Sequence, residues 1–186
     1  MEKFIKTVAF DLGGVLGYQD HSVLTEEEFF LFKVYMHRNS NNAEKEVVQY
    51  AKSKMGEIFV KMHKLNINTI QTLEMLKDAN IKPSIWTNNI PEINLWFESV
   101  NLYRYINAED VVNSFFLGAD KPDLEFYRRA LLQIKNNPQD VLFFDDNINN
   151  VIAARKVNII GEEYNMQDNL LEIVATEIKK GRRICK

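Results

Sequence analysis

Short apolar runs alternate with longer amphipathic stretches along the chain. The runs at Thr7–Phe10, 83–87 and 141–144 are short and rich in β-branched or aromatic residues, which predicts buried strands. Weaker strands are expected at 111–115 and 157–160. Strands that alternate with helical segments are typical of a parallel sheet with helices on both faces. The pattern therefore predicts an α/β fold with a doubly wound parallel sheet.

Helices are expected in the stretches between these strands. Thr25 and Glu28 form a capping-box pattern that predicts the start of one helix. A second helix is expected at 43–65, after a turn at 39–42, because its apolar residues recur at spacings of three and four. The remaining helical stretches are expected at 70–79, 91–100, 122–131, 149–156 and 170–180.

The first two helices are rich in Phe and Met and interrupt the strand pattern. They could be two packed surface helices, but their aromatic content favours a small helical cap inserted after the first strand. We therefore expect an α/β core formed by residues 1–18 and 66–186 and a helical cap formed by residues 19–65. The Trp96-Phe97 pair is expected in the hydrophobic core.

Composition adds only mild constraints. A chain of 186 residues, 46% hydrophobic and 26% charged, fits one globular domain with a small insertion. A formal net charge of −3 argues against a general nucleic-acid binder. Cys185 is the only cysteine, so a reducing compartment is expected. No apolar run reaches the roughly 20 residues of a membrane span, and no signal-peptide core precedes the first strand, so we expect a cytoplasmic protein that does not bind membranes.

Groups suited to phosphate chemistry follow four of the strands. They are Asp11, Thr87 with Asn88, Lys121, and Asp145 with Asp146. The carboxyl ends of parallel strands share one sheet edge, where open α/β sheets bind their ligands. Carboxylates beside the Gly13-Gly14 turn suit Mg²⁺, which prefers hard oxygen ligands. A lysine, a hydroxyl and an amide suit phosphoryl oxygens, and Asp11 could attack phosphorus to form an aspartyl phosphate.

These residues resemble the four motifs of the haloacid dehalogenase superfamily. The motifs read Val-Ala-Phe-Asp11-Leu-Gly-Gly-Val-Leu, Ile-Trp-Thr87-Asn88, Gly-Ala-Asp-Lys121-Pro-Asp and Phe-Phe-Asp145-Asp146-Asn-Ile-Asn-Asn150. They occur in order over residues 4–160. The resemblance implies a Rossmann-like fold, a helical cap after the first motif, and a hydrolase of small phosphorylated metabolites.

The resemblance also implies a role for each matching residue. Asp11 would be the nucleophile and a Mg²⁺ ligand, the main-chain carbonyl of Gly13 the second ligand, and Asp146 the third. Asp145 would bind through water or support the site.

The phosphate-binding roles fall on the second and third motifs. Thr87 and Asn88 would hold the phosphoryl group, and Lys121 would pair with both Asp11 and the phosphate. His21 could approach the leaving group, whereas His63 is expected to be a packed or solvated histidine.

Gly13 is the departure from the family pattern. Phosphatases of this superfamily usually carry an aspartate there, which protonates the leaving group and later activates water. The leading hypothesis is a Mg²⁺-dependent phosphate monoester hydrolase that works through an aspartyl phosphate. The alternatives are a dehalogenase-type hydrolase, which needs neither a metal nor an acid at position 13, and a weakly active phosphate-binding protein.

Overall fold

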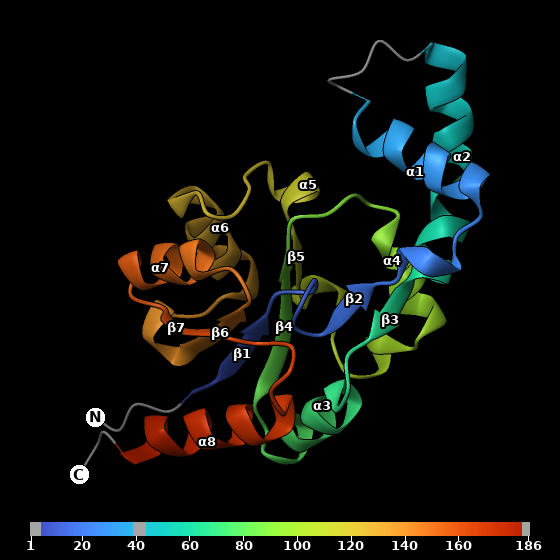
Figure 1. Ribbon diagram of the computed structural model, residues 1–186. Helices are drawn as coiled ribbons and strands as arrows, with labels where there is room; N and C mark the ends of the chain where they lie inside the picture. Colours follow the sequence, from blue (N-terminus) through green and yellow to red (C-terminus); the bar gives the residue numbers. More distant parts are fainter. Residues whose placement is uncertain (1–4, 39–43, 184–186) are drawn as a thin grey trace. The chain divides into compact units, whose positions relative to one another are not determined.

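The computed structural model describes residues 5–38 and 44–183 (Figure 1). The expected turn at 39–42 and Cys185 lie outside the described residues. The chain divides into two compact units. The core unit comprises Met1–Tyr18, Leu65–Ile90 and Tyr103–Lys186, and the helical unit comprises Gln19–Lys64 and Pro91–Leu102. The helical unit thus includes a second segment that the sequence pattern left in the core.

A five-stranded parallel sheet forms the centre of the core unit. Its strands are β1 (Thr7–Phe10), β4 (Lys82–Thr87), β5 (Val111–Asn113), β6 (Val141–Asp145) and β7 (Ile160–Glu163). Their order is β5-β4-β1-β6-β7, and every neighbouring pair is parallel. The predicted doubly wound parallel sheet is confirmed. The strand order reverses between β1 and β6, which is the point where open α/β sheets place their ligands.

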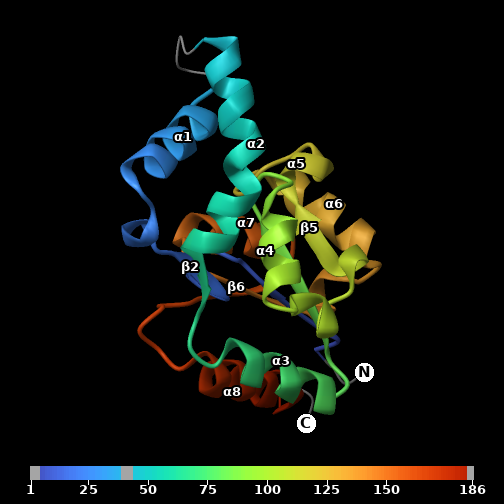
Figure 2. The same ribbon diagram turned by 90° about the vertical axis from the view of Figure 1, so that its right-hand side faces the viewer.

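The helices of the core unit cover both faces of this sheet. They are α3 (Thr69–Asp78), α5 (Ser114–Leu117), α6 (Leu124–Ile134), α7 (Ile148–Lys156) and α8 (Leu170–Arg183). Helices α3 and α8 pack together on one face, and α6 and α7 pack together on the other (Figures 1 and 2). The α6/α7 face buries Trp86 and Phe143, whose rings lie 5.2 Å apart, against Phe126 and Tyr127. This burial fixes the strands that carry the polar residues at the sheet edge.

Three α-helices lie in the described part of the helical unit. They are α1 (Glu26–Met36), α2 (Lys45–Met62) and α4 (Ile93–Ser99). The predicted capping box starts α1, with Glu28 N donating to Thr25 Oγ1 at 3.2 Å and Thr25 N donating to Glu28 Oε2 at 2.7 Å. Trp96 and Phe97 are fully buried, which confirms that they are core residues.

Short elements complete both units. The 3₁₀ helices are η1 (His21–Val23), η2 (Leu102–Arg104), η3 (Ala108–Asp110) and η4 (Pro138–Asp140). Strands β2 (Gly17–Gln19) and β3 (His63–Leu65) pair as a separate two-stranded sheet. Within the described residues, no helix is long and apolar enough to cross a membrane.

The second predicted helix is wrong at its carboxyl end. The sequence pattern carries it to residue 65, but the structure ends α2 at Met62 and continues as β3. Asp20 N donates to Met62 O at 2.8 Å, and β3 pairs with β2. Pairing with a distant segment replaces the last helical turn, and apolar spacing alone cannot report such a partner.

Two predicted strands at the sheet margins are also displaced. The strand expected at 111–115 ends at Asn113, because the Asn113 side chain accepts from Phe115 N and caps α5. The strand expected at 157–160 starts at Ile160 instead. Asn158 adopts a left-handed conformation (φ 65°), and Ile159 N donates to Ala154 O at 3.2 Å, so the helix-ending turn extends past 157.

Candidate active site

Three carboxylates meet at the carboxyl edge of the sheet. Asp11 follows β1, Asp145 ends β6, and Asp146 comes next. Because Phe10 lies opposite Phe144 in register and Asp11 N donates to Phe144 O at 2.8 Å, the two strands deliver their acids side by side. One oxygen from each of the three carboxylates lies within 4.8 Å of the others. Such a group of hard oxygen atoms could hold a divalent cation.

Lys121 forms ion pairs with two of these carboxylates. Its Nζ lies 2.6 Å from Asp11 Oδ1 and 2.7 Å from Asp145 Oδ2. The lysine side chain is only 2% exposed, and its ammonium lies 5.5 Å from the centre of the Phe143 ring. Strong charge-assisted hydrogen bonds in a dry environment therefore join the third predicted motif to the first and fourth.

Asp145 uses its oxygens to hold the protein together. It is completely buried and accepts from Asn150 Nδ2 at 2.9 and 3.0 Å and from Asn147 N at 2.9 Å, in addition to Lys121. Tyr127 Oη in turn donates to Asn150 O at 2.8 Å. These bonds leave Asp145 to support the site, and they leave Asp11 and the exposed Asp146 as the carboxylates that face outward.

Asn150 is a site residue for which the sequence pattern gave no role. It closes the fourth motif and lies in the first turn of α7, five residues after Asp145. The sequence feature that could have identified Asn150 is an asparagine in the first turn of a helix that directly follows an acidic strand end.

The second motif lies next to Lys121. Asn88 Nδ2 donates to Lys121 O at 2.9 Å, and Asn88 Oδ1 accepts from Lys121 N at 2.9 Å. This two-way contact with the main chain fixes the loop that carries the lysine. Thr87 is the last residue of β4 and is 2% exposed. The structure thus places Asp11 and Thr87 at neighbouring strand ends, and Lys121, from the segment between α5 and α6, contacts Asp11 and Asn88.

The glycine turn after Asp11 lies close to the acids. Gly14 has a φ of 79°, and a Cβ there would lie 2.2 Å from Asp146 Oδ2, so only glycine fits. At Gly13, leaving aside its two chain neighbours, the one described atom within 4 Å of an added Cβ is Asp11 Oδ2, at 3.9 Å. That is an ordinary contact distance, so position 13 has room for a side chain beside the Asp11 carboxylate.

Burial, together with the neighbouring charges, shifts the pKa of two of the carboxylates. Burial raises the pKa of Asp11 to about 6, with a further upward effect from Asp145, although Lys121 acts in the opposite direction. Burial, and then the charge of Asp145, also raise the pKa of Asp146. One ammonium does not balance three carboxylates, so the site favours an added positive charge.

The two histidines considered from the sequence lie in the helical unit. His21 packs against Phe29 and Phe32, with ring centres at 5.6 and 5.2 Å. His63 is buried between Phe59 and Trp96, and burial lowers its pKa to about 4. His63 is therefore a neutral, packed histidine at pH 7, which fits the expectation that it is structural.

Replacing Lys121 should destabilise the fold strongly. In Lys121→Met the completely buried Asp145 loses its cationic partner, and breaking such a pair costs about 3–5 kcal/mol. Urea unfolding measures this loss. Lys54→Met is the matched control, because its 3.5 Å pair with Glu57 is exposed and should change stability by about 1 kcal/mol or less. Equal losses in both variants would contradict the buried-pair argument.

Replacing Asp11 should stabilise the metal-free protein at neutral pH. Because the folded pKa of about 6 exceeds the ordinary 3.8, the folded state binds more protons between these values, and stability falls as pH rises through them. With EDTA present, the free energy of unfolding of Asp11→Asn should exceed that of the unmodified protein by about 1–3 kcal/mol at pH 7.5. The gap should shrink towards pH 4.5. Urea titrations at both pH values test this, and a gap independent of pH would refute it.

Solved structures of known proteins share this fold. A haloacid dehalogenase superfamily hydrolase from Ehrlichia chaffeensis matches with a TM-score of 0.66 and 20% identity, covering 96% of this chain and 98% of that one. An enzyme of the same family from Bacteroides thetaiotaomicron was solved with magnesium and inorganic phosphate. It matches with a TM-score of 0.67 and 16% identity, covering 91% of this chain and 98% of that one. At these identities the likeness shows the fold.

Curated relatives match over shorter stretches. A sesquiterpene phosphatase from Aspergillus oryzae is 39% identical over 59 residues, which is 32% of this chain and 30% of the relative. A drimenol cyclase from Aspergillus calidoustus is 34% identical over 62 residues, which is 33% of this chain and 12% of the relative. The matches thus span less than a third of either relative's length.

A protein-family model covers most of the chain. The model for haloacid dehalogenase-like hydrolases matches residues 18–158, which is well over half of the sequence. The resemblance recognised in the four motifs is confirmed, and the chain belongs to the family of haloacid dehalogenase-like hydrolases.

Proposed function

We propose that this protein is a Mg²⁺-dependent hydrolase of small phosphate monoesters that works through an aspartyl phosphate on Asp11. The observation that carries the proposal is the arrangement around Lys121, whose ammonium holds Asp11 at 2.6 Å while Asp146 lies in the same group of carboxylates. This arrangement gives one fixed nucleophile, one cation for phosphoryl oxygens and an outward-facing metal ligand.

The donor set fits magnesium. The proposed ligands are Asp11, the main-chain carbonyl of Gly13 and Asp146, all of them hard oxygen donors. Their carboxylate oxygens lie within 4.8 Å of one another, and Mg²⁺ takes oxygen ligands at about 2.0–2.1 Å, so opposite ligands stand about 4 Å apart. When bound, the ion would offset the repulsion between these carboxylates and the incoming phosphate.

Each of these residues has its own role in the proposed reaction. Asp11 attacks phosphorus, and the bond from phosphorus to the ester oxygen breaks. The leaving alkoxide takes its proton from water, because Gly13 supplies none. Thr87, Asn88 and Lys121 hold the phosphoryl oxygens, and Asp145 with Asn150 keeps Lys121 in place. Attack of water on phosphorus releases phosphate and restores Asp11.

Relatives support the phosphatase reading. One structural relative was solved with magnesium and inorganic phosphate, one from Thermococcus onnurineus is described as a phosphatase, and one curated relative is a sesquiterpene phosphatase. We further propose that residues 19–65 act as a cap that takes part in substrate selection. The pair Asp145-Asp146 disfavours the dehalogenase alternative, because extra carboxylates beside the nucleophile are favourable mainly when a cation is present.

Phosphate release should depend on Mg²⁺ and on Asp11. A panel of p-nitrophenyl phosphate, sugar phosphates and farnesyl phosphate, assayed with Mg²⁺ or EDTA, measures it. Asp11→Asn should abolish turnover, and Asp146→Asn should weaken Mg²⁺ activation by about tenfold or more.

The same panel separates the alternatives. Release of halide from 2-haloacids in EDTA would replace the proposal with the dehalogenase function. Stabilisation by Mg²⁺ with phosphate, without turnover of any ester, would replace it with the binding function.

Installing an acid at position 13 should accelerate the reaction. Gly13→Asp fits sterically, because the nearest atom to its Cβ is Asp11 Oδ2 at 3.9 Å. General acid/base help is worth about 10²- to 10⁴-fold, and an increase in kcat in the lower part of that range is expected. Gly13→Asn is the matched control, since it has the same shape and cannot transfer the proton. Equal kcat values for the two variants would contradict the idea that Gly13 limits turnover.

A further inference from the structure

The loop after β1 is closed on itself by two main-chain hydrogen bonds. Gly14 N donates to Gly17 O at 2.8 Å, and Gly17 N donates to Leu12 O at 2.9 Å. These bonds fix the shape of the loop that carries the Gly13 carbonyl. Holding this loop against the end of β6, which carries the third proposed metal ligand, requires contacts from outside the loop.

Asn66 supplies such a contact. It directly follows β3 in the core unit and is buried, and its side-chain Nδ2 donates to Val15 O at 3.0 Å. Its main-chain N donates to Leu16 O at 2.9 Å, and Thr69 Oγ1 donates to the same carbonyl at 2.9 Å. Two successive carbonyls of the loop are thus bound by one short segment at the start of α3.

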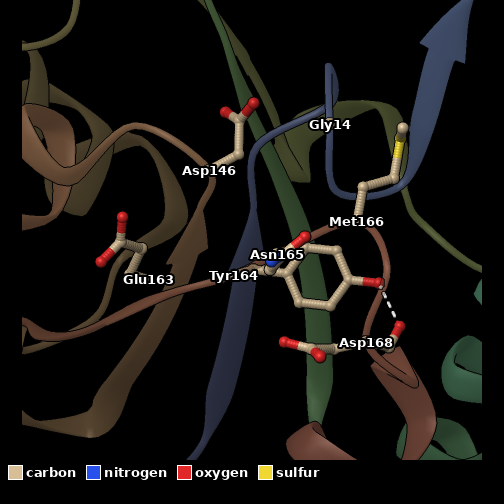
Figure 3. A pocket seen from close by; sticks show the side chains of 7 residues that line it. All are labelled: Gly14, Asp146, Glu163, Tyr164, Asn165, Met166 and Asp168. Atoms are coloured by element: carbon tan, nitrogen blue, oxygen red, sulfur yellow. Dashed lines mark hydrogen bonds between the residues drawn. The ribbon is translucent and has the colours of Figure 1, made fainter.

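The side-chain amide of Asn66 also reaches the segment after β7. Asn66 Nδ2 donates to Tyr164 Oη at 3.3 Å, and Tyr164 Oη donates to Asp168 O at 2.9 Å (Figure 3). Tyr164 is buried, and its main-chain N donates to Asp145 O at 3.0 Å. The amide therefore connects, through one tyrosine, to the main chain directly before Asp146.

Asn66 thus links the two halves of the proposed metal site. One half is the loop after β1, and the other is the end of β6 with Asp146. The halves lie close together, because a Cβ at Gly14 would lie 2.2 Å from Asp146 Oδ2, and Gly14, Asp146 and Tyr164 line one cavity (Figure 3). Asn66 Oδ1 accepts from Ile67 N at 2.7 Å, which fixes the orientation of the amide.

We propose that Asn66 is a positioning residue that sets the spacing between the loop after Asp11 and the carboxylate of Asp146. This inference rests on the proposed function, from which it takes the metal ligands. Mg²⁺ requires near-ideal octahedral geometry at about 2.0–2.1 Å, whereas Ca²⁺ accepts more variable geometry at about 2.3–2.6 Å. A fixed spacing therefore favours Mg²⁺, and loss of the Asn66 amide weakens Mg²⁺ binding more than Ca²⁺ binding.

Calorimetry of the metal-free protein with Mg²⁺ and with Ca²⁺ tests this role without relying on turnover. In Asn66→Ala the Kd of Mg²⁺ should rise by about tenfold or more, as when other groups that orient metal ligands are removed. The Kd of Ca²⁺ should rise less. Tyr164→Phe keeps the ring and the bond from Tyr164 N to Asp145 O, so it should cause a smaller shift in the same direction. This variant carries the test if Asn66→Ala does not fold.

Asn113→Ala is the matched control. Asn113 is also a buried asparagine of the core unit, whose Nδ2 donates to Ile90 O at 3.4 Å and whose Oδ1 accepts from Phe115 N at 3.0 Å. Both partners lie beyond the ends of β4 and β5. Truncating Asn113 should lower the free energy of unfolding in urea but leave the ratio of the Mg²⁺ and Ca²⁺ dissociation constants unchanged.

The outcomes separate this inference from the proposed function. Mg²⁺ binding that neither Asn66→Ala nor Tyr164→Phe weakens would overturn the inference alone. Equal weakening of Mg²⁺ and Ca²⁺ binding in these variants and in Asn113→Ala would do the same, because it would reflect a general loss of stability. Absence of Mg²⁺ binding by the unmodified protein would overturn the proposed function and this inference with it. Binding that depends on Asn66, without hydrolysis of any ester, would overturn the hydrolase function and support the role of Asn66.

Discussion

The buried ion pairs of Lys121 with Asp11 and Asp145 are the interaction on which the rest of the site depends. They join the end of β1, the end of β6 and the segment before α6, which are more than a hundred residues apart at the extremes. A charge this deeply buried needs a carboxylate partner, and the completely buried Asp145 supplies one to Lys121. Asn88 fixes the main chain of the lysine, and Asn150 fixes the carboxylate of Asp145, so the sheet edge is assembled as one polar network.

The same network contains more negative than positive charge. One ammonium faces three carboxylates, and burial keeps the pKa of Asp11 high. This arrangement lowers the stability of the unliganded protein and favours an added positive charge at the site. Active sites commonly trade stability for function in this way.

The two glycines after Asp11 differ in what they allow. Gly14 is required, because its backbone conformation and the closeness of Asp146 leave no space for a side chain. Position 13 has room for a Cβ atom, so steric hindrance does not explain why it carries glycine in place of an acid. The chain therefore brings Asp11 and Lys121 together without an acidic side chain at position 13.

Much of this protein could be predicted from its sequence, for physical reasons that also explain the failures. The strands β1, β4 and β6 are buried on both faces, so each appears as a continuous apolar run, and the acids or hydroxyls that end them stand out. The capping box of α1 is likewise a local signal. Strands β2 and β3 depend on pairing with a segment far along the chain. The end of β5 and the start of β7 are set by local capping hydrogen bonds that the apolar pattern does not report. The sequence by itself determined the parallel α/β fold and the residues Asp11, Lys121 and Asp145 as a set. Only the tertiary structure decided that Asp145 is saturated by Asn150 while Asp146 stays open, because hydrogen-bond partners and burial arise when distant strand ends are brought together.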